Sequence, residues 1–291
     1  MNTIVCLGGG YGNMRFIQRI LPKLPSGYTI TLVDKNPFHG MKTEYYALAA
    51  GTKSEKNVRV DFPDDDRVNI VFDTVSEIDI DRNRVILENQ TLDYDMLVIG
   101  LGCEDKYHGV PGAEEHTYSI QSLRESRATY ESIGDLKPGS TVGIVGAGLS
   151  GIEVASELRE AREDLHIKLF DRGDRILPMY PARLSAYVKR WFDDNDVEVI
   201  PNSNIVKVEA DKVYNNNESH DLDLAIWTAG VQPVEVVRNL PVEFGPGGRV
   251  VLNQYHQVPG HENVYVVGDS AALKHAPSAQ VAEGQAEQIA E

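Results

Sequence analysis

The sequence has only two cysteines in 291 residues, and they form no CxxC pair. Cys6 lies within an apolar, strand-like segment, where a reactive thiol is not expected, and Cys103 follows the glycine that ends another such segment. Some redox enzymes exchange electrons through a closely spaced cysteine pair. Nothing in this sequence has that spacing, so both cysteines are expected to be ordinary buried or half-buried thiols.

Long apolar segments and export signals are also missing. No apolar run approaches the ~20 residues needed to span a bilayer. The N-terminal apolar run, Thr3 to Leu7, has no basic segment before it and leads directly into glycines, so it predicts a first β-strand and not a signal peptide. We therefore expect a globular, cytoplasmic protein.

Positive charge is scarce. The formal net charge is −16 and the sequence pI is near 4.9, so nucleic acid and anionic lipid surfaces are not expected as partners. The eight histidines show no metal-binding spacing, and no Ser-His-Asp or paired-carboxylate arrangement is present. A small anionic ligand remains compatible with this charge, because backbone N–H groups at a helix N-terminus bind phosphate.

The sequence does contain one pattern that occurs twice. An apolar β-branched run, a glycine turn and an apolar pattern of helical period occur at Thr3 to Ile20 and again at Thr141 to Leu158. A second apolar run then ends in Asp34 or Asp171, about 25 residues beyond the first glycine, which is near the spacing of a dinucleotide-binding βαβ unit. Two matches at the same spacing are far more specific than one.

The second copy fits the GxGxxG motif fully. Gly146 permits a tight turn, Gly148 lets the backbone approach a pyrophosphate, and Gly151 permits close helix–strand packing. The phosphates are expected at the N-terminus of the following helix. Asp171 would accept hydrogen bonds from ribose hydroxyls and repel a 2′-phosphate, which favours NADH over NADPH, although the neighbouring Arg172 would soften that preference.

The first copy departs from the motif at one position. Gly8 and Gly10 occupy the first two glycine positions, with Gly12 close by, but Asn13 stands at the third. Asp34 supports the assignment, because it lies where the ribose-binding acid of such a unit is expected.

These landmarks predict an α/β fold of two Rossmann-like dinucleotide-binding domains, the second inserted in the first. The first domain would comprise about residues 1–111 and 241–291, and the second about 112–240. Small antiparallel inserts are expected at Asn69 to Val85 and Val197 to Val213, where apolar residues alternate with polar ones.

The C-terminal segment is expected to complete the first domain. Short strands are predicted at Arg249 to Leu252 and Asn263 to Val267, followed by a helix from about Ser278. The second strand runs into Gly268 and Asp269, which would place a carboxylate near the ribityl chain of a flavin. The N-terminus of the helix would stabilise the negative charge of a reduced flavin; the alternative is an ordinary packed amphipathic helix.

The whole chain resembles the type II NADH dehydrogenases, the single-subunit NADH:quinone oxidoreductases of the two-dinucleotide-binding flavoprotein superfamily. The likeness covers nearly all of the chain. The segments that carry it are LGGGYGN (7–13), LVDKNPFH (32–39), TEYYALAAGT (43–52), YDMLVIGLG (94–102), VPG (110–112), IVGAGLSGIEVASEL (144–158), RILP (175–178), RLSAYVKRWF (183–192), IWTAGVQP (226–233), VYVVGDSA (264–271) and PSAQVAEGQ (277–285).

The resemblance implies two cofactors, FAD in the first domain and NADH in the second. The residues it places at a non-covalent FAD are Gly8, Gly10, Asp34, Lys35, Thr43, Gly102 and Asp269, and we add Gly12, Gly268 and Ala279 as cofactor-binding candidates. The residues it places at NADH are Gly146, Gly148, Gly151, Asp171 and Gly230.

Two candidate catalytic residues also come from the resemblance. Glu153 matches a family glutamate near the nicotinamide and quinone region; alternatively, it only complements the dipole of its helix. Gln280, in the pair Ala279–Gln280, matches the family's quinone-facing motif.

The sequence departs from the family pattern in two ways. The family motif has a second glutamine four residues after the first, where this chain has Gly284 followed by Gln285. Family members also continue into amphipathic membrane-binding helices, whereas this sequence ends at Glu291. We therefore expect either a fragment, whose missing region would supply contact with the cytoplasmic membrane face, or a soluble relative.

The expected function is that of an NADH dehydrogenase with ping-pong kinetics. A hydride would pass from NADH to FAD, and two electrons would then pass to a quinone-type acceptor. The alternatives are a soluble NADH diaphorase or electron-carrier reductase, and a redox-sensing FAD/NADH-binding protein with little turnover. A homodimer is suggested by analogy alone.

Overall fold

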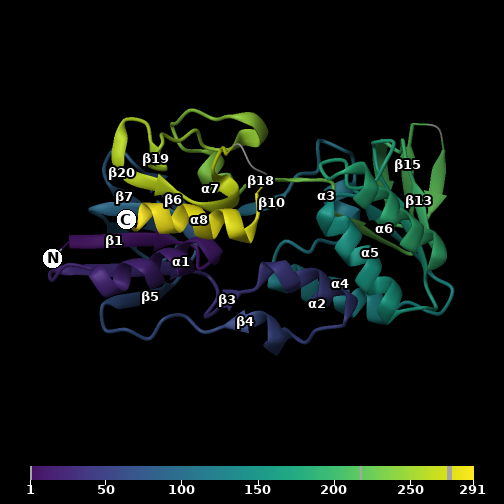
Figure 1. Ribbon diagram of the computed structural model, residues 1–291, viewed down its shortest axis with the longest axis horizontal. Coiled ribbons are helices and arrows are strands. Elements are labelled where there is room, and N and C mark those ends of the chain that lie inside the picture. The colour runs from purple at the N-terminus through teal and green to yellow at the C-terminus, as the bar shows by residue number, and fades with distance from the viewer. Residues whose placement is uncertain (1, 217, 274–276) are drawn as a thin grey trace. The chain divides into compact units, whose positions relative to one another are not determined.

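The structure is a computed structural model that describes residues 2–216, 218–273 and 277–291 and divides into two compact units. Unit 1 comprises Met1–Met41, Arg59–Glu104 and Gln232–Glu291. Unit 2 comprises Lys42–Val58 and Asp105–Val231. Each unit is built around its own parallel β-sheet, and the elements are labelled in Figure 1.

The sheet of unit 1 has six strands in the order β19-β20-β9-β1-β2-β5. All neighbouring strands are parallel except β19 and β20, which are antiparallel. The strands and the helix that follows the first of them are β1 (Asn2–Leu7), α1 (Tyr11–Ile20), β2 (Tyr28–Asp34), β5 (Val68–Phe72), β9 (Met96–Ile99), β19 (Gln257–Val258) and β20 (His261–Val266).

Alternate residues of β1 serve two separate cores in unit 1. Ile4 and Cys6 pack with Phe16 of α1 and Ala286 of α8 (Ala279–Ile289) on one face of the sheet. The opposite residues of β1 pack with the antiparallel strands β6 (Val75–Asp79), β7 (Arg84–Leu87) and β8 (Thr91–Asp93) and with α7 (Glu235–Arg238). The strand is therefore apolar and buried from Ile4 to Leu7, as expected for a parallel sheet covered on both faces.

Short elements complete unit 1. A two-stranded pair is formed by β3 (His39–Gly40) and β4 (Arg59–Val60). Single turns of 3₁₀ helix are η1 (Leu21–Lys23), η4 (Pro246–Gly248) and η5 (Gly268–Ser270). The chain enters unit 2 twice: first for Lys42–Val58, and then through β10 (Cys103–Asp105), from which it returns through β18 (Val231–Pro233).

Unit 2 repeats the central plan with a four-stranded parallel sheet in the order β13-β12-β11-β17. Its elements are β11 (Thr141–Val145), α5 (Leu149–Ala161), β12 (His166–Phe170), α6 (Ala182–Asp194), β13 (Val197–Ile200) and β17 (Leu224–Trp227). Helices α2 (Tyr45–Ala50), α4 (Leu123–Gly134) and α5 pack together on one face. Around them lie η2 (Lys42–Glu44), η3 (Glu55–Val58), α3 (Ala113–His116) and the antiparallel strands β14 (Ile205–Glu209), β15 (Lys212–Asn215) and β16 (Ser219–Asp221).

The compact units are divided differently from the predicted domain boundaries. The segment Lys42–Val58 clusters with unit 2, because α2 packs against α4 and α5. The chain therefore crosses between the units at four points: Met41/Lys42, Val58/Arg59, Glu104/Asp105 and Val231/Gln232.

Three predicted strand assignments differ from the structure. Val68–Phe72 and Val197–Ile200 are parallel edge strands, paired with β2 and β12, and only the segments that follow them are antiparallel. An edge strand of a parallel sheet is partly exposed, so its polar alternation imitates an antiparallel insert. Arg249–Leu252 forms no strand; Val250 alone makes isolated bridges, to Phe244 and Ala271.

Candidate functional site

Both glycine turns require glycine at their first position. Gly8 and Gly146 have φ values of +87° and +108°. A Cβ atom on Gly8 would lie 2.6 Å from the carbonyl oxygen of Gly100, and one on Gly146 would lie 2.8 Å from the Cα of Ala229. The chain can therefore turn sharply from strand to helix only because these residues lack side chains.

Each turn leads into a helix whose N-terminus has no side-chain cap. Gly10 and Gly148 are the N-cap residues of α1 and α5, both extended, and no side chain of the described residues caps either helix. Neither helix has an acidic residue in its first turn. A Cβ on Gly148 would meet nothing within 4 Å. First-turn N–H groups lack intrahelical acceptors, so both ends suit a diphosphate.

An aspartate is bound to each turn in the same way. In unit 1, Asp34 accepts hydrogen bonds from the backbone N–H of Gly9 at 2.6 Å and of Asn36 at 2.7 Å. In unit 2, Asp171 accepts them from Ala147 and Gly173, both at 2.7 Å.

This arrangement holds each carboxylate beside the helix N-terminus, at the end of the second strand. Oxygen lone pairs remain for ribose hydroxyls, since an ionised carboxylate has about four acceptor sites.

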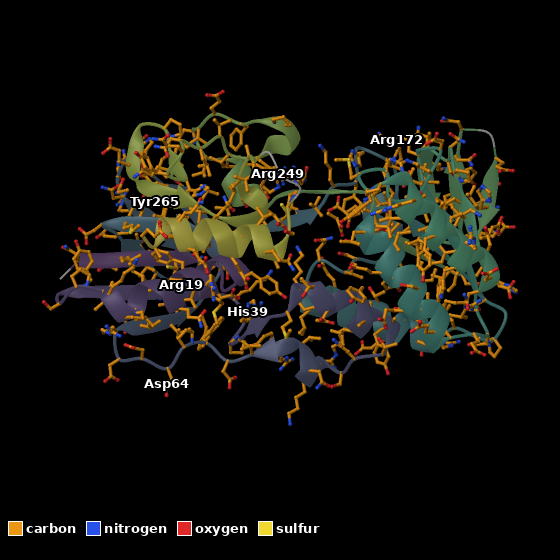
Figure 2. All side chains as sticks on the ribbon, in the orientation of Figure 1. Arg19, His39, Asp64, Arg172, Arg249 and Tyr265 are labelled. Atoms are coloured by element: carbon orange, nitrogen blue, oxygen red, sulfur yellow. The ribbon has the colours of Figure 1, made fainter. Side chains whose placement is uncertain are left out.

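The carboxyl ends of β9 and β20 are joined in unit 1. Gly102 has a φ of +73°, and its carbonyl accepts a hydrogen bond from the hydroxyl of Ser270 at 2.7 Å. The carbonyl of Asp269 accepts from the Sγ of Cys103 at 3.3 Å and from the Nε of Arg249 at 2.9 Å. Arg249 is labelled in Figure 2. These bonds fix the backbone around half-buried Asp269, and Cys103 is a buried thiol with a structural contact, as predicted.

Helix α8 begins beside this region. Ser278 is its N-cap and accepts from the N–H of Val281 at 3.2 Å, so Ala279 and Gln280 form its first turn, with Gln280 exposed. No role is predicted for Gln285 from the sequence, yet its buried amide oxygen accepts from the N–H of Gly268 at 2.9 Å.

The remaining predicted residues of the first site lie elsewhere or serve packing. Gly12 is buried on α1, where a Cβ would lie 2.7 Å from the Cγ2 of Val267. Lys35 is exposed directly after β2. Thr43 lies in η2, within unit 2. The structure therefore brings together in unit 1 the two glycines, Asp34, Gly102 and the segment around Asp269.

In unit 2, Gly230 ends the turn after β17. Its φ is +123°, and its carbonyl accepts from the N–H of Lys106 at 3.0 Å. His108 bonds the neighbouring carbonyl of Ala229 through Nε2 at 2.9 Å. This exposed turn lies at the same sheet edge as the Gly146 turn, because β11 and β17 are adjacent parallel strands.

Glu153 belongs to a group of acidic side chains in unit 2. It is the fifth residue of α5, beyond the first turn, so a role limited to the helix dipole gains no support. Burial, followed by the carboxylates of Glu44 and Glu157, raises the pKa of Glu153 to about 7. The same surroundings raise the pKa of Tyr46.

Two contacts hold the neighbours of Glu153 in place. The hydroxyl of Thr52 donates to Glu157, and Lys53 forms an ion pair with Glu44. The spacing of Glu153 and Glu157 on one helix face was visible in the sequence, whereas the approach of Glu44 depends on the packing of α2 against α5.

Neither a metal-binding cluster nor a membrane-spanning helix occurs among the residues that the structure describes. In residues 2–216, 218–273 and 277–291, no group of three or more His, Cys, Asp or Glu side chains could hold a metal ion. Within the same residues, no helix has the length and hydropathy required to cross a bilayer.

Comparison with known proteins gives close relatives of known class. The chain is 54% identical over 291 residues to the NADH dehydrogenase-like protein YutJ of Bacillus subtilis, covering 99% of this chain and 82% of that protein. It is 28% identical over 300 residues to a type II NADH:quinone oxidoreductase of Staphylococcus epidermidis, covering 93% of this chain and 74% of that protein.

Solved structures share the fold. The sulfide:quinone oxidoreductase of Aquifex aeolicus matches with a TM-score of 0.84 and 20% identity, over 100% of this chain and 76% of that one. The NDH2 of Plasmodium falciparum in complex with NADH matches with a TM-score of 0.82 and 19% identity, over 93% and 64%. At such identities the likeness concerns architecture alone.

These findings confirm the resemblance to the type II NADH dehydrogenases and the predicted fold of two dinucleotide-binding domains. They also confirm that the protein is an oxidoreductase with FAD and NADH as its cofactors. The family profile described as pyridine nucleotide-disulphide oxidoreductase matches residues 2–286. The chain belongs to that family.

Proposed function

We propose that the chain is an NADH dehydrogenase that binds FAD in unit 1, binds NADH in unit 2 and delivers two electrons to a quinone-type acceptor. The observation that carries this proposal is the repetition of one turn: a positive-φ glycine, an uncapped helix N-terminus and an aspartate held by backbone N–H groups. One such turn accommodates one dinucleotide, so two of them support a cofactor together with a co-substrate.

The residues of unit 1 fit FAD. Gly8 permits the turn, Gly10 leaves room for the diphosphate at the start of α1, and Asp34 would bind the adenosine ribose. Asp269 and Gly102 would lie along the ribityl chain. When bound, FAD supplies the chemistry of accepting a hydride and releasing two electrons singly or together.

The residues of unit 2 fit NADH in the same way. The open space beside Gly148 would take the diphosphate, and Asp171 would bind the adenosine ribose. A 2′-phosphate would meet the negative charge of Asp171, so NADH is the preferred donor. The exposed guanidinium of Arg172 (Figure 2) would reduce this preference without reversing it.

Glu153 is proposed as the group that delivers a proton to the reduced acceptor. A carboxylic acid with a pKa near 7 is protonated in part of the molecules at neutral pH, and its conjugate base can be reloaded from water. Gln280, exposed on the first turn of α8, is proposed to contact the acceptor.

One observation keeps a second function in view. The position of the family's second glutamine is Gly284, which is exposed with nothing within 4 Å of a Cβ built on it, and Gln285 is turned inward to Gly268. A soluble diaphorase or electron-carrier reductase, or a redox sensor with little turnover, would not need a complete quinone-binding motif.

An anaerobic titration tests the proposal. The FAD-loaded protein is titrated with NADH and, separately, with NADPH, while the flavin absorbance near ~450 nm is followed. A short-chain quinone is then added. Bleaching by NADH at lower concentration than NADPH, followed by recovery of colour with quinone, is the expected result.

The other outcomes each discriminate. Bleaching that quinone does not reverse, but that ferricyanide or a one-electron carrier does, replaces the quinone reductase with a diaphorase. Bleaching that no acceptor reverses supports the sensor. Protein that cannot retain FAD overturns the assignment of unit 1.

A further inference from the structure

A polar side chain bonds the backbone of each glycine turn from the space between the helix and the neighbouring strand, but the residue that supplies it differs between the two units. The last residues of the paired strands correspond, because Leu7 of β1 faces Ile99 of β9 and Val145 of β11 faces Trp227 of β17. The next residue after β9 is Gly100, and the next after β17 is Thr228. On the helices, Asn13 and Gly151 occupy the same motif position.

In unit 2, the side chain beneath the turn comes from the strand. The Oγ1 of Thr228 lies 3.0 Å from the carbonyl oxygen of Val145 and 2.9 Å from that of Gly146. A hydroxyl carries one proton, so it donates to one of these two carbonyls at a time.

In unit 1, the side chain comes from the helix. The Nδ2 of Asn13 lies 2.8 Å from the carbonyl oxygens of both Leu7 and Gly8. Two acceptors at this distance require the amide nitrogen, with its two protons, to face them. Asn13 therefore bonds the same two backbone positions that Thr228 bonds in unit 2, and it can bond both together.

The space between helix and strand admits only one of the two side chains. A Cβ on Gly100 would lie 2.7 Å from the Nδ2 of Asn13. A Cβ on Gly151 would lie 2.8 Å from the Oγ1 of Thr228 and 1.8 Å from the carbonyl oxygen of Gly146. The departure from the third glycine in unit 1 is thus matched by a glycine on the neighbouring strand.

These donors act on the peptide plane that also carries the recognition aspartate. The carbonyl of Gly146 accepts from Thr228, and the N–H of the same peptide unit, on Ala147, donates to Asp171 at 2.7 Å. A peptide unit is rigid and planar, so holding its C=O fixes the direction of its N–H. In unit 1, Asn13 and Asp34 hold the two ends of the Gly8–Gly9 peptide in the same way.

We propose that Thr228 and Asn13 are positioning residues, each of which orients the ribose-binding aspartate of its site through one clamped peptide plane. This inference rests on the proposed function, because it takes NADH and FAD as the ligands of the two sites. Thr228 serves Asp171 and NADH, and Asn13 serves Asp34 and FAD. Asn13, which donates two protons, serves the site of FAD, the cofactor that stays bound. Thr228, which donates one, serves the site of NADH, the co-substrate that exchanges.

The first test substitutes Thr228 by residues of similar size. Thr228→Val keeps the shape but removes the donor and leaves a carbonyl unsatisfied, so the KM for NADH and the Kd for NAD⁺ should rise about tenfold. The preference for NADH over NADPH should narrow, because Asp171 loses its orientation. FAD content should not change. Thr228→Ser keeps the donor and should restore both values.

Thr129→Val is the matched control. The Oγ1 of Thr129 likewise lies within hydrogen-bond distance of two backbone carbonyls, of Ser119 at 2.7 Å and Glu125 at 2.9 Å, and the side chain is fully buried on α4. This variant should lower the melting temperature and leave the NADH-to-NADPH ratio unchanged. If Thr129→Val narrows that ratio as much as Thr228→Val does, or if Thr228→Val leaves it at the wild-type value, the clamp is overturned.

The second test builds the threonine and glycine of unit 2, Thr228 and Gly151, at the equivalent positions of unit 1, Gly100 and Asn13. Asn13→Gly removes the donor and Gly100→Thr introduces a clash, so each single variant should lose FAD on dilution. The double variant N13G/G100T recreates the Thr228–Gly151 pair and should retain FAD better than either single variant. Retention no better than in the worse single variant would contradict the inference. Wild-type protein that binds neither dinucleotide would instead refute the proposed function, and the melting temperatures of the same variants would still report on the clamp.

Discussion

At the scale of single residues, Glu153 gives the clearest dependence on pH. Its pKa is raised from 4.5 to about 7, so the folded protein keeps a proton that the unfolded chain has released between these values. The free energy of unfolding therefore falls as the pH rises through this window. Below pH 4.5 the side chain is protonated in both states and costs nothing.

The substitution Glu153→Gln should remove this dependence. We expect the melting temperature of the variant to exceed that of the wild type by a margin that grows from pH 5 to pH 8. If Glu153 delivers the proton, the rate of acceptor reduction at pH 6 should fall about 100-fold and lose its step near pH 7. Bleaching by NADH should be little affected. Stopped-flow measurement of the two half-reactions across this pH range provides the check.

Glu160→Gln is the control for that experiment, because Glu160 lies on the same helix and is exposed. It should change neither the pH profile nor the stability margin. A Glu153→Gln variant that reduces quinone at the wild-type rate at every pH would remove Glu153 from the mechanism. The margin in melting temperature would then describe burial alone.

Alanine substitution at two glycines of the second GxGxxG motif should affect different properties, ligand binding in one variant and stability in the other. Gly148 has a φ of −72° and room for a Cβ, so Gly148→Ala should leave stability unchanged while the methyl group obstructs the diphosphate and weakens NAD⁺ binding about tenfold. In Gly151→Ala the Cβ would lie 1.8 Å from a backbone oxygen, so overpacking should cost about 1–3 kcal/mol.

Calorimetry and NAD⁺ titration of both variants separate these effects. The loss in Gly151→Ala corresponds to about 2–4 °C of melting temperature per kcal/mol in a protein of this size. Equal losses of stability in the two variants would contradict the idea that only the first-turn N–H groups at Gly148 face a ligand.

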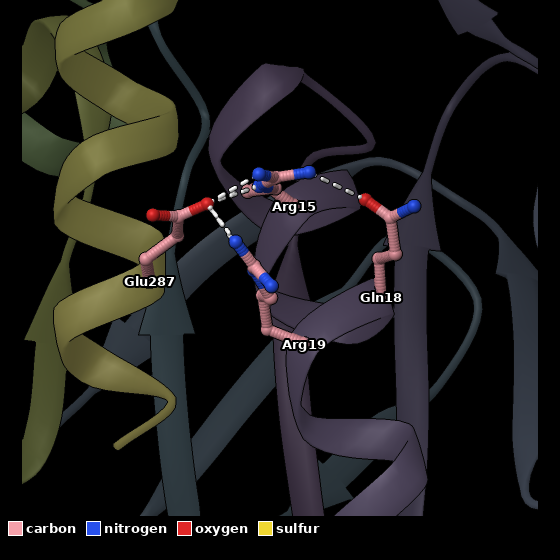
Figure 3. Close-up of polar contacts among 4 residues, drawn as sticks. All are labelled: Arg15, Gln18, Arg19 and Glu287. Atoms are coloured by element: carbon pink, nitrogen blue, oxygen red, sulfur yellow. Dashed lines mark hydrogen bonds and ion pairs between the residues drawn. The ribbon is translucent and has the colours of Figure 1, made fainter.

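At the scale of elements, α1 and α8 are joined by a charge cluster in unit 1. One carboxylate oxygen of Glu287 accepts from the Nη2 of Arg19 at 2.6 Å and from the Nε of Arg15 at 2.8 Å, and Arg15 also donates to Gln18 at 3.0 Å (Figure 3). The hydrogen bonds from Arg19 and Arg15 hold the pKa of Glu287 below its ordinary value. The two helices are distant in sequence, so this cluster links the N-terminal and C-terminal segments of unit 1.

The substitution Glu287→Gln should slightly weaken the link between α1 and α8 and so lower the stability of unit 1. A lowered carboxyl pKa contributes stability that is fully present above the ordinary value of 4.5 and is lost as the pH falls from there through the lowered pKa of the folded state. We therefore expect a small drop in melting temperature at pH 7 that shrinks as the pH falls below the ordinary pKa and in high salt, because the cluster is partly exposed. Glu283→Gln, on the same helix, serves as control. A drop in melting temperature that is the same size in high salt as in low salt would show that the effect is not electrostatic.

The elements show what the sequence could and could not predict. The glycine turns, the two central βαβ units and the helix from Ser278 were predicted because strand period, helix period and turn chemistry agree locally. Edge strands β5 and β13 were assigned the wrong pairing, since local alternation does not record which neighbour a strand selects. The donors Asn13 and Thr228 were missed because their partners come together only when the sheet forms.

At the scale of the whole molecule, each unit carries its own parallel sheet and its own apolar cores. The paired glycine and aspartate of each turn lie within a single unit. A ligand that binds one turn therefore stabilises the unit that contains it, by the mass action of binding to the folded state.

This separation can be measured by hydrogen exchange. With NAD⁺ at 100 times its Kd, amides in residues 143–152 of unit 2 should exchange up to about 100-fold more slowly, because opening of the turn requires release of the ligand. Amides in residues 6–13 of unit 1 should respond to FAD loading and not to NAD⁺. Gly148→Ala should lose the first effect and keep the second.

Protection of the turn that a ligand is not proposed to occupy would contradict the assignment of the two sites. If NAD⁺ slowed exchange in residues 6–13 of a protein prepared without FAD, the first turn would be a second nicotinamide-dinucleotide site and the assignment of FAD to unit 1 would fall. If FAD alone protected both turns equally, the two units would unfold as one, because stabilisation of unit 1 would then reach the amides of unit 2 in full. Protection confined to the turn that each ligand is proposed to occupy is the result expected from two separately clamped sites.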